Sequence, residues 1–356
     1  MKSWCGIIYL LLMSSYNSAF AENVINLYTT SNYIADSTVS NFEKRCKCKL
    51  FLNYFSDPQE MSAKLVAGAS GYDVIIGTGY ALQDINNAGK LAQLDLNKIH
   101  NLANIESKFM HQPFDPKNSF SIPYAYTPVF LAYNKTVLDK LGIVPDSWAV
   151  IFDEKYLKQL RGKVTVFDSQ RNVFAAALLY LGKDPNSTNL KDLESARKLI
   201  ERASHYWARY DSTIYYRSLL DGEIWVAMSY SNDLYNTLQD TKKIKLNYTF
   251  AGMLQKEGNM VELDNVVITA NTKNIDLDYL FIDTVLEAKS AIALSNETGA
   301  SVPNWQALAS LPSDIVSNTW IYPQQNNLIF GFTAYPPKIR VMANEMWTEL
   351  KMECHY

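Results

Sequence analysis

The stretch DVII at residues 73–76 is the clearest indication of the fold class of this chain. It is a short, wholly apolar run behind an aspartate, the pattern of a parallel strand that is buried on both faces. Further strand and helix patterns alternate upstream of it, at residues 26–29 (NLYT), 38–47, 50–54 and 61–67. Strands that alternate with helices at this spacing are typical of βαβ units. The sequence therefore predicts an α/β lobe in this part of the chain.

The later part of the chain repeats this alternation. The patterns predict strands and helices at residues 163–167 (KVTVF), 171–181, 190–203, 224–228 (IWVAM), 279–294 and 341–352. Thr188 and Asn189 are candidate caps for the helix predicted at residues 190–203, since their side chains can accept its free N–H groups. Gly299 is expected to end the helix predicted at residues 279–294. The chain has 356 residues, more than one hydrophobic core usually fills. We therefore predict two α/β lobes.

The composition excludes several classes of protein. Hydrophobic residues make up 48% of the chain and charged residues 19%, which is unlike a disordered or collagen-like chain. The formal net charge of -3 argues against a nucleic-acid binder, which normally carries basic residues to neutralise phosphates. The chain also holds 23 Tyr, 15 Phe and 7 Trp, more aromatic residues than a core of this size needs. Some of these tyrosines are therefore expected to serve a site.

The amino-terminal residues have the order of a secretory signal peptide. Lys2 precedes an apolar run at residues 7–13, and Ala19 and Ala21 supply the small residues of a cleavage site. The apolar run is shorter than the roughly 20 residues that span a bilayer. We predict a signal peptide at residues 1–21, cleavage after Ala21, and export of the mature chain to the periplasm.

Three cysteines remain after this cleavage, in a compartment that favours disulfides. They are Cys46, Cys48 and Cys354. In an extended segment, Cys46 and Cys48 could bridge one another only with strain, so we expect one of them to pair with Cys354. Such a bridge would join the first helix to the last. The odd number leaves one free thiol in either case.

Six segments resemble the periplasmic polyamine-binding proteins, of the spermidine/putrescine type, that supply ABC transporters. The most specific is FDPKNSFSIPYAYTPVFLAYN at residues 114–134. The others occur in the family's order over nearly the whole mature chain: NLYTTSNYI (26–34), YDVIIGTGYALQDINNAGKLAQLD (72–95), LDGEIWVAMSYS (220–231), LQKEGNMVELDNVVITANTKN (254–274) and NETGASVPN (296–304).

The resemblance implies a two-lobe periplasmic binding protein fold of type II. Each lobe is expected to be a mostly parallel sheet flanked by helices, with a hinge between the lobes and a ligand cleft at their junction. The expected division is residues 22–131 plus 264–308 for one lobe and residues 132–263 plus 309–356 for the other. The resemblance also implies a monomer without a cofactor or enzymatic activity, which delivers putrescine or spermidine to a permease and ATPase.

A polyamine site needs carboxylates for the ammonium groups and aromatic faces for the methylenes. Asp264 stands where the family keeps its principal amine-pairing acid. Glu262 replaces a family aromatic, and two residues apart on an extended segment face the same way. Tyr33, Thr78 and Tyr80 match further cleft positions of the family.

The chain also departs from the family at several cleft positions. Tyr126 and Tyr230 stand where the family usually has Trp, and the loop Thr30-Ser31-Asn32 stands where it commonly has an aromatic and an acid. Ser169 and Asn172 align with a cleft Asp and Glu, which leaves only Asp168 as an acid nearby. Ala300 replaces another family aromatic. The resemblance therefore implies a site formed by these residues: Asn32, Tyr33, Thr78, Tyr80, Tyr126, Ser169, Asn172, Tyr230, Glu262 and Asp264.

The altered site leaves three alternatives open. The ligand could be another small cation, or the chain could be a receptor or adaptor that keeps the fold without transport. Tyr215 and Tyr216 form a phenolate pair able to hold ferric ion, although no His is positioned to help. No HExxH, GxSxG, P-loop or GxGxxG string supports an enzyme, and no metal site is expected.

Overall fold

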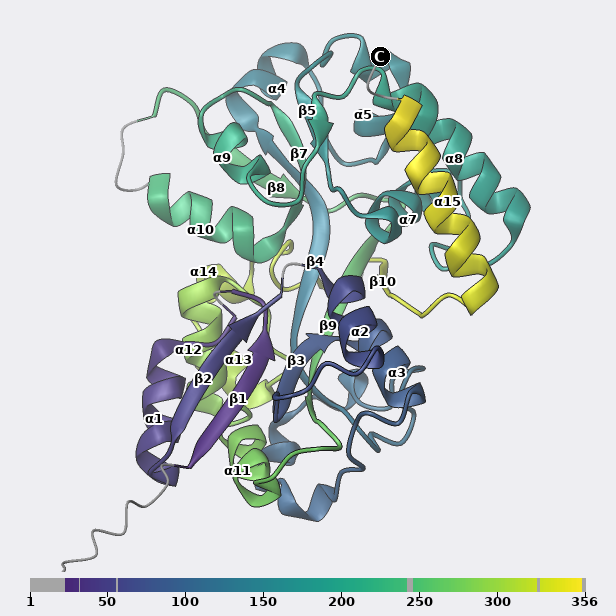
Figure 1. Cartoon of the computed structure of the whole chain (residues 1–356). Helices are drawn as coiled ribbons and strands as arrows, with labels where there is room; N and C mark the ends of the chain where they lie inside the picture. The colour runs from purple at the N-terminus through teal and green to yellow at the C-terminus, as the bar shows by residue number, and fades with distance from the viewer. Residues whose placement is uncertain (1–22, 32, 56, 242–245, 325–326, 354–356) are drawn as a thin grey trace, which may run out of the picture.

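The computed structural model describes residues 23–31, 33–55, 57–241, 246–324 and 327–353. The chain forms two lobes, and β4 (Ile122–Asn134) and β9 (Asn259–Ile268) run through both of them (Figure 1). This arrangement confirms the predicted two-lobe α/β architecture. The predicted signal peptide at residues 1–21 lies outside the described residues.

The lower lobe in Figure 1 is built on the predicted βαβ units. These units are formed by β1 (Val24–Thr29), α1 (Asp36–Cys46), β2 (Lys49–Tyr54), α2 (Pro58–Val66), β3 (Val74–Thr78) and α3 (Gly79–Asn87). Strand β1 pairs in parallel with both β2 and β3, and every residue of β3 is buried. The Asp73 carboxylate accepts a hydrogen bond from the Asn26 backbone N–H at 2.8 Å, which holds β1 and β3 together at their start.

The upper lobe holds the second half of the alternation. Its elements are α4 (Lys135–Leu141), β5 (Val164–Val166), α7 (Gln170–Tyr180), α8 (Leu190–Ser204), β6 (Arg209–Tyr210), α9 (Tyr215–Leu220), β7 (Val226–Tyr230), α10 (Ser231–Thr241), β8 (Phe250–Met253) and α15 (Pro337–Glu353). Asn189 caps α8 as predicted, since its side chain accepts the Lys191 N–H at 2.9 Å.

The two lobes share one sheet. Its strand order is β2-β1-β3-β9-β4-β7-β5-β6, with β8 paired to β4 and β10 (Ile329–Gly331) paired to β9. Strand β9 is antiparallel to β3 and to β4, and it places Asp264 opposite both Thr78 and Ala125. Because β4 and β9 cross the junction, the residues at their middle lie between the lobes.

One long helix predicted at residues 279–294 is two helices in the structure. They are α11 (Ile275–Val285) and α12 (Ala288–Thr298), and the chain breaks at Glu287, which has an extended backbone conformation. Gly299 ends α12 in the left-handed conformation, as its position in the sequence predicts. The apolar face continues across the break, which is why periodicity alone does not reveal it.

The predicted pairing of Cys46 or Cys48 with Cys354 is wrong, because Cys46 and Cys48 are bonded to each other. The expectation of strain assumed an extended segment. Instead, Cys46 ends α1, and Lys47 adopts the left-handed conformation with φ 51°. This turn brings the two cysteine Cα atoms within 5.1 Å, a separation that suits a disulfide. Cys354 lies outside the described residues.

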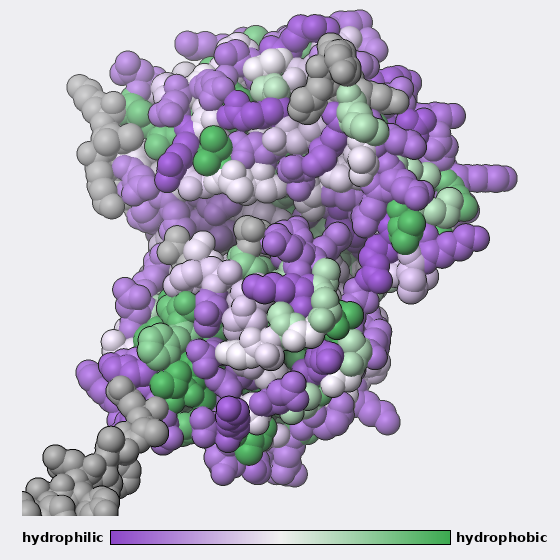
Figure 2. All heavy atoms as spheres, in the orientation of Figure 1, coloured by the Kyte–Doolittle hydropathy of each residue, from purple (hydrophilic) through white to green (hydrophobic). Residues whose placement is uncertain are grey.

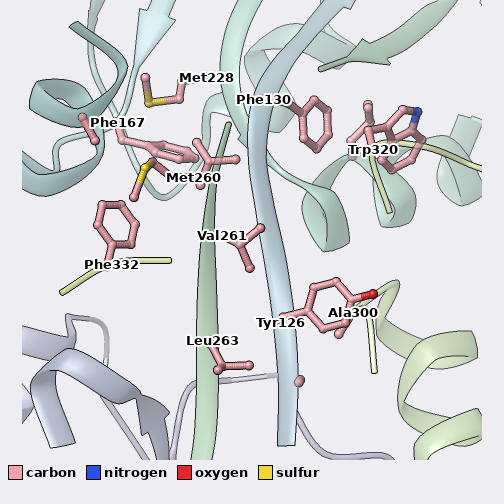
Figure 3. Close-up of a cluster of buried hydrophobic side chains, with 14 of the residues drawn as sticks. Tyr126, Phe130, Phe167, Met228, Met260, Val261, Leu263, Ala300, Trp320 and Phe332 are labelled. Atoms are coloured by element: carbon pink, nitrogen blue, oxygen red, sulfur yellow. The ribbon is translucent and has the colours of Figure 1, made fainter. Parts of the chain in front are cut away.

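The apolar core fills the junction as well as both lobes. Figure 3 shows side chains from β4 and β9 meeting Phe167, Trp320 and Phe332, which come from other parts of the chain. The face of the molecule in Figure 2 is mainly hydrophilic and narrows between the lobes. Among the described residues, no helix has the length and apolar character that a membrane crossing requires.

Candidate ligand-binding site

A cleft of about 870 Å³ lies at the junction of the two lobes. The lower lobe contributes Tyr33, Thr78 and Tyr80, and the carboxyl end of β3 directs Thr78 toward the cleft. The upper lobe and the crossing strands supply the remaining polar wall: Thr127, Ser169, Asp211, Tyr230, Asp233, Glu262 and Asp264. Most of the residues predicted from the sequence are therefore brought together here.

Glu262 and Asp264 form a pair of carboxylates on one face of β9. Thr78 Oγ1 donates to Asp264 Oδ1 at 2.9 Å and lies 3.4 Å from Glu262 Oε2, so one hydroxyl contacts both acids. The Tyr33 hydroxyl donates to Asp264 Oδ2 at 2.5 Å. Since one hydroxyl donates only one hydrogen, Thr78 donates to one of the two carboxylates at a time.

Two side chains of the upper lobe donate hydrogen bonds to Glu262. The Tyr230 hydroxyl donates to Glu262 Oε1 at 2.9 Å, and Asn172 Nδ2 donates to the same oxygen at 3.0 Å. Asn172 is buried in the first turn of α7, where its amide also contacts Ser169 Oγ at 3.1 Å. Ser169 and Asn172 thus support Glu262 on β9.

The acid pair has no basic partner among the described residues. Burial is the main cause that raises the pKa of Glu262 to about 7, and the neighbouring negative charge of Asp264 adds to it. Burial also raises the pKa of Asp264, against the opposing effect of its bonds from Tyr33 and Thr78. Two crowded carboxylates without a counter-ion favour a cation.

Three tyrosines border this acid pair. Burial and the nearby carboxylates raise the pKa of Tyr33 and Tyr230, so both hydroxyls stay protonated and donate hydrogen bonds. The Tyr230 ring stacks on Phe167 with their centroids 4.4 Å apart, and the Tyr80 ring meets Phe332 edge-on at 5.9 Å. Packing therefore fixes these rings, which offer flat faces to the methylenes of a ligand.

The structure does not place Tyr126 in the cleft. On β4, Thr127 lies opposite Glu262 and borders the cleft, whereas Tyr126 lies opposite Leu263. Successive strand residues face opposite sides, so Tyr126 points away. Its ring stacks on Phe109 at 4.6 Å and lies beside Ala300 (Figure 3). The prediction from the sequence is wrong because the strand register decides the side.

The sequence prediction also included the loop before Tyr33 and the acid next to Ser169. Thr30 and Ser31 line the cleft, but Asn32 lies outside the described residues. Asp168 is exposed at the rim of the cleft and forms an ion pair with Lys351 at 2.9 Å. The ammonium group of Lys351 therefore already pairs with this carboxylate. The described residues contain no cluster of three or more His, Cys, Asp or Glu side chains that could hold a metal.

Sequence reasoning missed Asp233, another carboxylate of the cleft. It lies in the first turn of α10, directly after β7, and accepts a hydrogen bond from the Tyr215 hydroxyl. Burial raises the pKa of Asp233 to about 6. An acid that follows a buried strand in the string SYSND was the available signal. Tyr215 is fully buried in this contact. Its hydroxyl is therefore not free to act as one of the two phenolates suggested for a ferric-ion site.

These features define a two-lobe binding protein with an acidic, tyrosine-bordered cleft. The family model "Bacterial extracellular solute-binding protein" matches residues 37–324, and the chain belongs to this family.

Its relatives include polyamine-binding proteins. It is 38% identical to the "Putrescine/cadaverine-binding protein" of Pseudomonas aeruginosa, over 96% of this chain and 97% of that protein. It is 29% identical to the "Putrescine-binding periplasmic protein PotF" of Escherichia coli, over 98% of each. Among solved structures, a "Putative spermidine/putrescine ABC transporter" from Listeria monocytogenes superposes with a TM-score of 0.83 at 25% identity, covering 93% of this chain and 99% of that one.

Proposed function

We propose that this protein binds a polyamine, putrescine or spermidine, and delivers it to the permease and ATPase of an ABC transporter. The observation that carries the proposal is the pair Glu262 and Asp264, which has no basic partner in the described part of the chain. A ligand ammonium group supplies the missing positive charge. The names of the relatives, which bind putrescine, cadaverine or spermidine, support the same ligand class.

Binding proceeds by capture between the lobes, without chemistry. Thr78 and Tyr33 come from the lower lobe and Asn172 and Tyr230 from the upper lobe, yet all four bond to the two acids of β9. A cation at these acids therefore contacts both lobes and stabilises their closed arrangement. Asp233 lies elsewhere in the same cleft, where it can pair with a second ammonium group.

The further features of this proposal concern the mature chain. We propose that it starts after Ala21, acts in the periplasm as a monomer, and divides at the lobe limits given by the family resemblance. The relatives described as periplasmic support the location. Another small cation is the second candidate ligand, and Glu262 in place of a family aromatic favours it.

Calorimetry with putrescine, cadaverine and spermidine on the mature protein tests the ligand class. We expect saturable heat with at least one of them, and Asp264→Asn should weaken that binding by roughly 2–5 kcal/mol, because it leaves a buried ammonium group unpaired. Asp276→Asn is the matched control, since Asp276 is exposed and pairs only with Lys98 at the surface. If wild-type protein gives neither heat nor a thermal shift with any polyamine, the proposed ligand class is wrong.

A further inference from the structure

A second pocket, of about 640 Å³, lies beside the cleft. Helices α2 and α3 border it from the lower lobe. Helix α7 and the segment that leads into α15 border it from the upper lobe. Tyr80 and Gln170 line both this pocket and the cleft, so the two spaces are neighbours.

The pocket contains a buried guanidinium group without an ionic partner. Arg171 is 3% exposed and forms no ion pair with any described residue. Its Nη2 donates to Asn186 Oδ1 at 2.8 Å and to the Thr333 carbonyl at 3.0 Å, and both acceptors are neutral. Its Nε and Nη1 have no hydrogen-bond partner. A buried cation that lacks a counter-ion carries a large desolvation cost.

Two more residues of the pocket wall carry a buried polar atom without a partner. Gln170 Nε2 and the Tyr335 hydroxyl have no hydrogen-bond partner, although these residues are only 6% exposed. The guanidinium carbon of Arg171 lies 3.8 Å from the Tyr335 ring centroid and 5.0 Å from that of Phe332. The two rings fix the plane of the guanidinium group, and a fixed guanidinium fork matches a carboxylate.

The acidic residues of this pocket do not serve as a counter-ion for Arg171. Asp84 forms an ion pair with Arg340, and Asp57 accepts the Glu60 backbone N–H at 2.7 Å at the start of α2. Asp57 and Glu60 are both exposed, so water screens their charges. The unpaired groups of Gln170, Arg171 and Tyr335 are instead buried.

We propose that this pocket is a second binding site, which takes a carboxylate group on Arg171, with Gln170 and Tyr335 as further hydrogen-bond partners. A carboxylate here contacts the upper lobe directly and faces α2 and α3 of the lower lobe. It therefore favours the closed arrangement and couples to binding in the cleft. The carboxylate belongs either to a free small acid or to a longer ligand whose amine lies at Glu262 and Asp264. The site does not depend on the polyamine assignment.

Acetate is the first probe, titrated into the mature protein without any polyamine and compared with chloride at equal ionic strength. We expect a saturable calorimetric signal and thermal stabilisation with acetate. Arg171→Gln should weaken acetate binding about tenfold or more, since a hydrogen bond to a charged group contributes about 1.5–3 kcal/mol. Arg45→Gln is the matched control and should keep the signal, because Arg45 pairs with Glu287 and neither residue lines this pocket.

A second set of titrations separates the two sources of the carboxylate. Linear ω-amino acids of increasing length are compared with acetate in wild-type protein and in Asp264→Asn. Binding of an amino acid that needs both Arg171 and Asp264 assigns the carboxylate to the end of a longer ligand. Acetate binding that is unchanged in Asp264→Asn assigns it to a free acid. Either result supports the site.

A crystal of wild-type protein soaked in 4-bromobenzoate, whose aryl bromide does not alkylate side chains, provides a measurement that does not depend on how a variant folds. An anomalous bromine peak in this pocket, with the carboxylate on Arg171, is the expected result. Ordered water on the three unpaired groups, together with equal effects of acetate and chloride, would overturn the proposal. Polyamine binding is measured separately, so failure here leaves the proposed function standing.

Discussion

At the scale of single residues, the cleft is defined by contacts between two elements. Asn172 on α7 and Glu262 on β9 meet at 3.0 Å, and the amide of Asn172 donates to the carboxylate. Glu262 and Asp264 lie two residues apart on the same strand, and the Thr78 hydroxyl contacts both.

The burial and crowding of these acids predict that protein stability and ligand affinity change in opposite directions with pH. An unfolded Glu releases its proton near its ordinary pKa of 4.5, whereas the pKa of Glu262 in the folded protein is about 7. Between these values the folded state binds the extra proton, so the ligand-free protein loses stability as pH rises from about 4.5 to 7. Asp233, with its pKa raised to about 6, acts in the same direction. Affinity for a cation should rise over the same interval, because the acids ionise.

Melting temperatures and calorimetry over this pH interval measure both effects. Glu262→Gln should flatten both profiles, since its amide does not titrate, whereas Asp276→Asn should leave them unchanged. A Glu262→Gln protein with the wild-type pH profile would contradict the assignment.

At the scale of elements, the turn after α1 is an unusual local structure. Lys47 lies in the left-handed conformation between two bonded cysteines, and the Cys48 backbone N–H bonds to the Glu43 carbonyl at 3.4 Å. The disulfide therefore fixes the end of α1 and the start of β2, the edge strand of the sheet. It does not join distant parts of the chain.

Reduction of this disulfide should have a small effect on stability. The loop it closes is very short, and the chain-entropy relation for such a loop gives about 1.5 kcal/mol. We expect a modest fall in melting temperature for the Cys46→Ser/Cys48→Ser protein and none for Cys354→Ser. Mass spectrometry of a non-reduced tryptic digest should show Cys46 bonded to Cys48 and Cys354 as a free thiol. A fragment that joins Cys354 to either of them would refute the pairing.

At the scale of the whole molecule, β4 and β9 determine how the lobes are arranged. These two strands cross the junction (Figure 1), and the cleft lies where they do so. Away from the cleft, Arg340 in α15 forms an ion pair with Asp84 in α3. This contact joins the upper lobe to the lower lobe without touching the proposed ligand.

Removal of this contact should weaken polyamine binding through closure alone. Asp84→Asn loses an ion pair present in the closed arrangement, and partly exposed pairs contribute about 0.2–1 kcal/mol. We expect affinity to fall by at most about fivefold at low salt, with a smaller loss at high salt, where charges are screened. Asp139→Asn, which breaks a pair with Lys135 inside α4, is the control and should not change affinity. An equal loss in both variants would argue against a closure contact.

Several features of this protein follow from the sequence by itself. Periodicity predicts the βαβ units around β3, because a strand covered on both faces must be apolar throughout. The order of motifs indicates the family and points to Asp264, and the two-residue spacing on a strand places Glu262 on the same face. The strand and the shared face are confirmed because they depend only on local geometry, whereas the role of Asp264 stays a prediction.

Tertiary structure decided the features that depend on contacts between distant segments. The register of β4 against β9 turns Tyr126 into the core, and the fold of α9 and α10 brings Asp233 to the cleft with Tyr215. A left-handed residue pairs Cys46 with Cys48, contrary to the distant bridge expected from an extended segment. The unpaired donors of Arg171 are also visible only in the folded chain, because burial and the absence of a partner are properties of its surroundings.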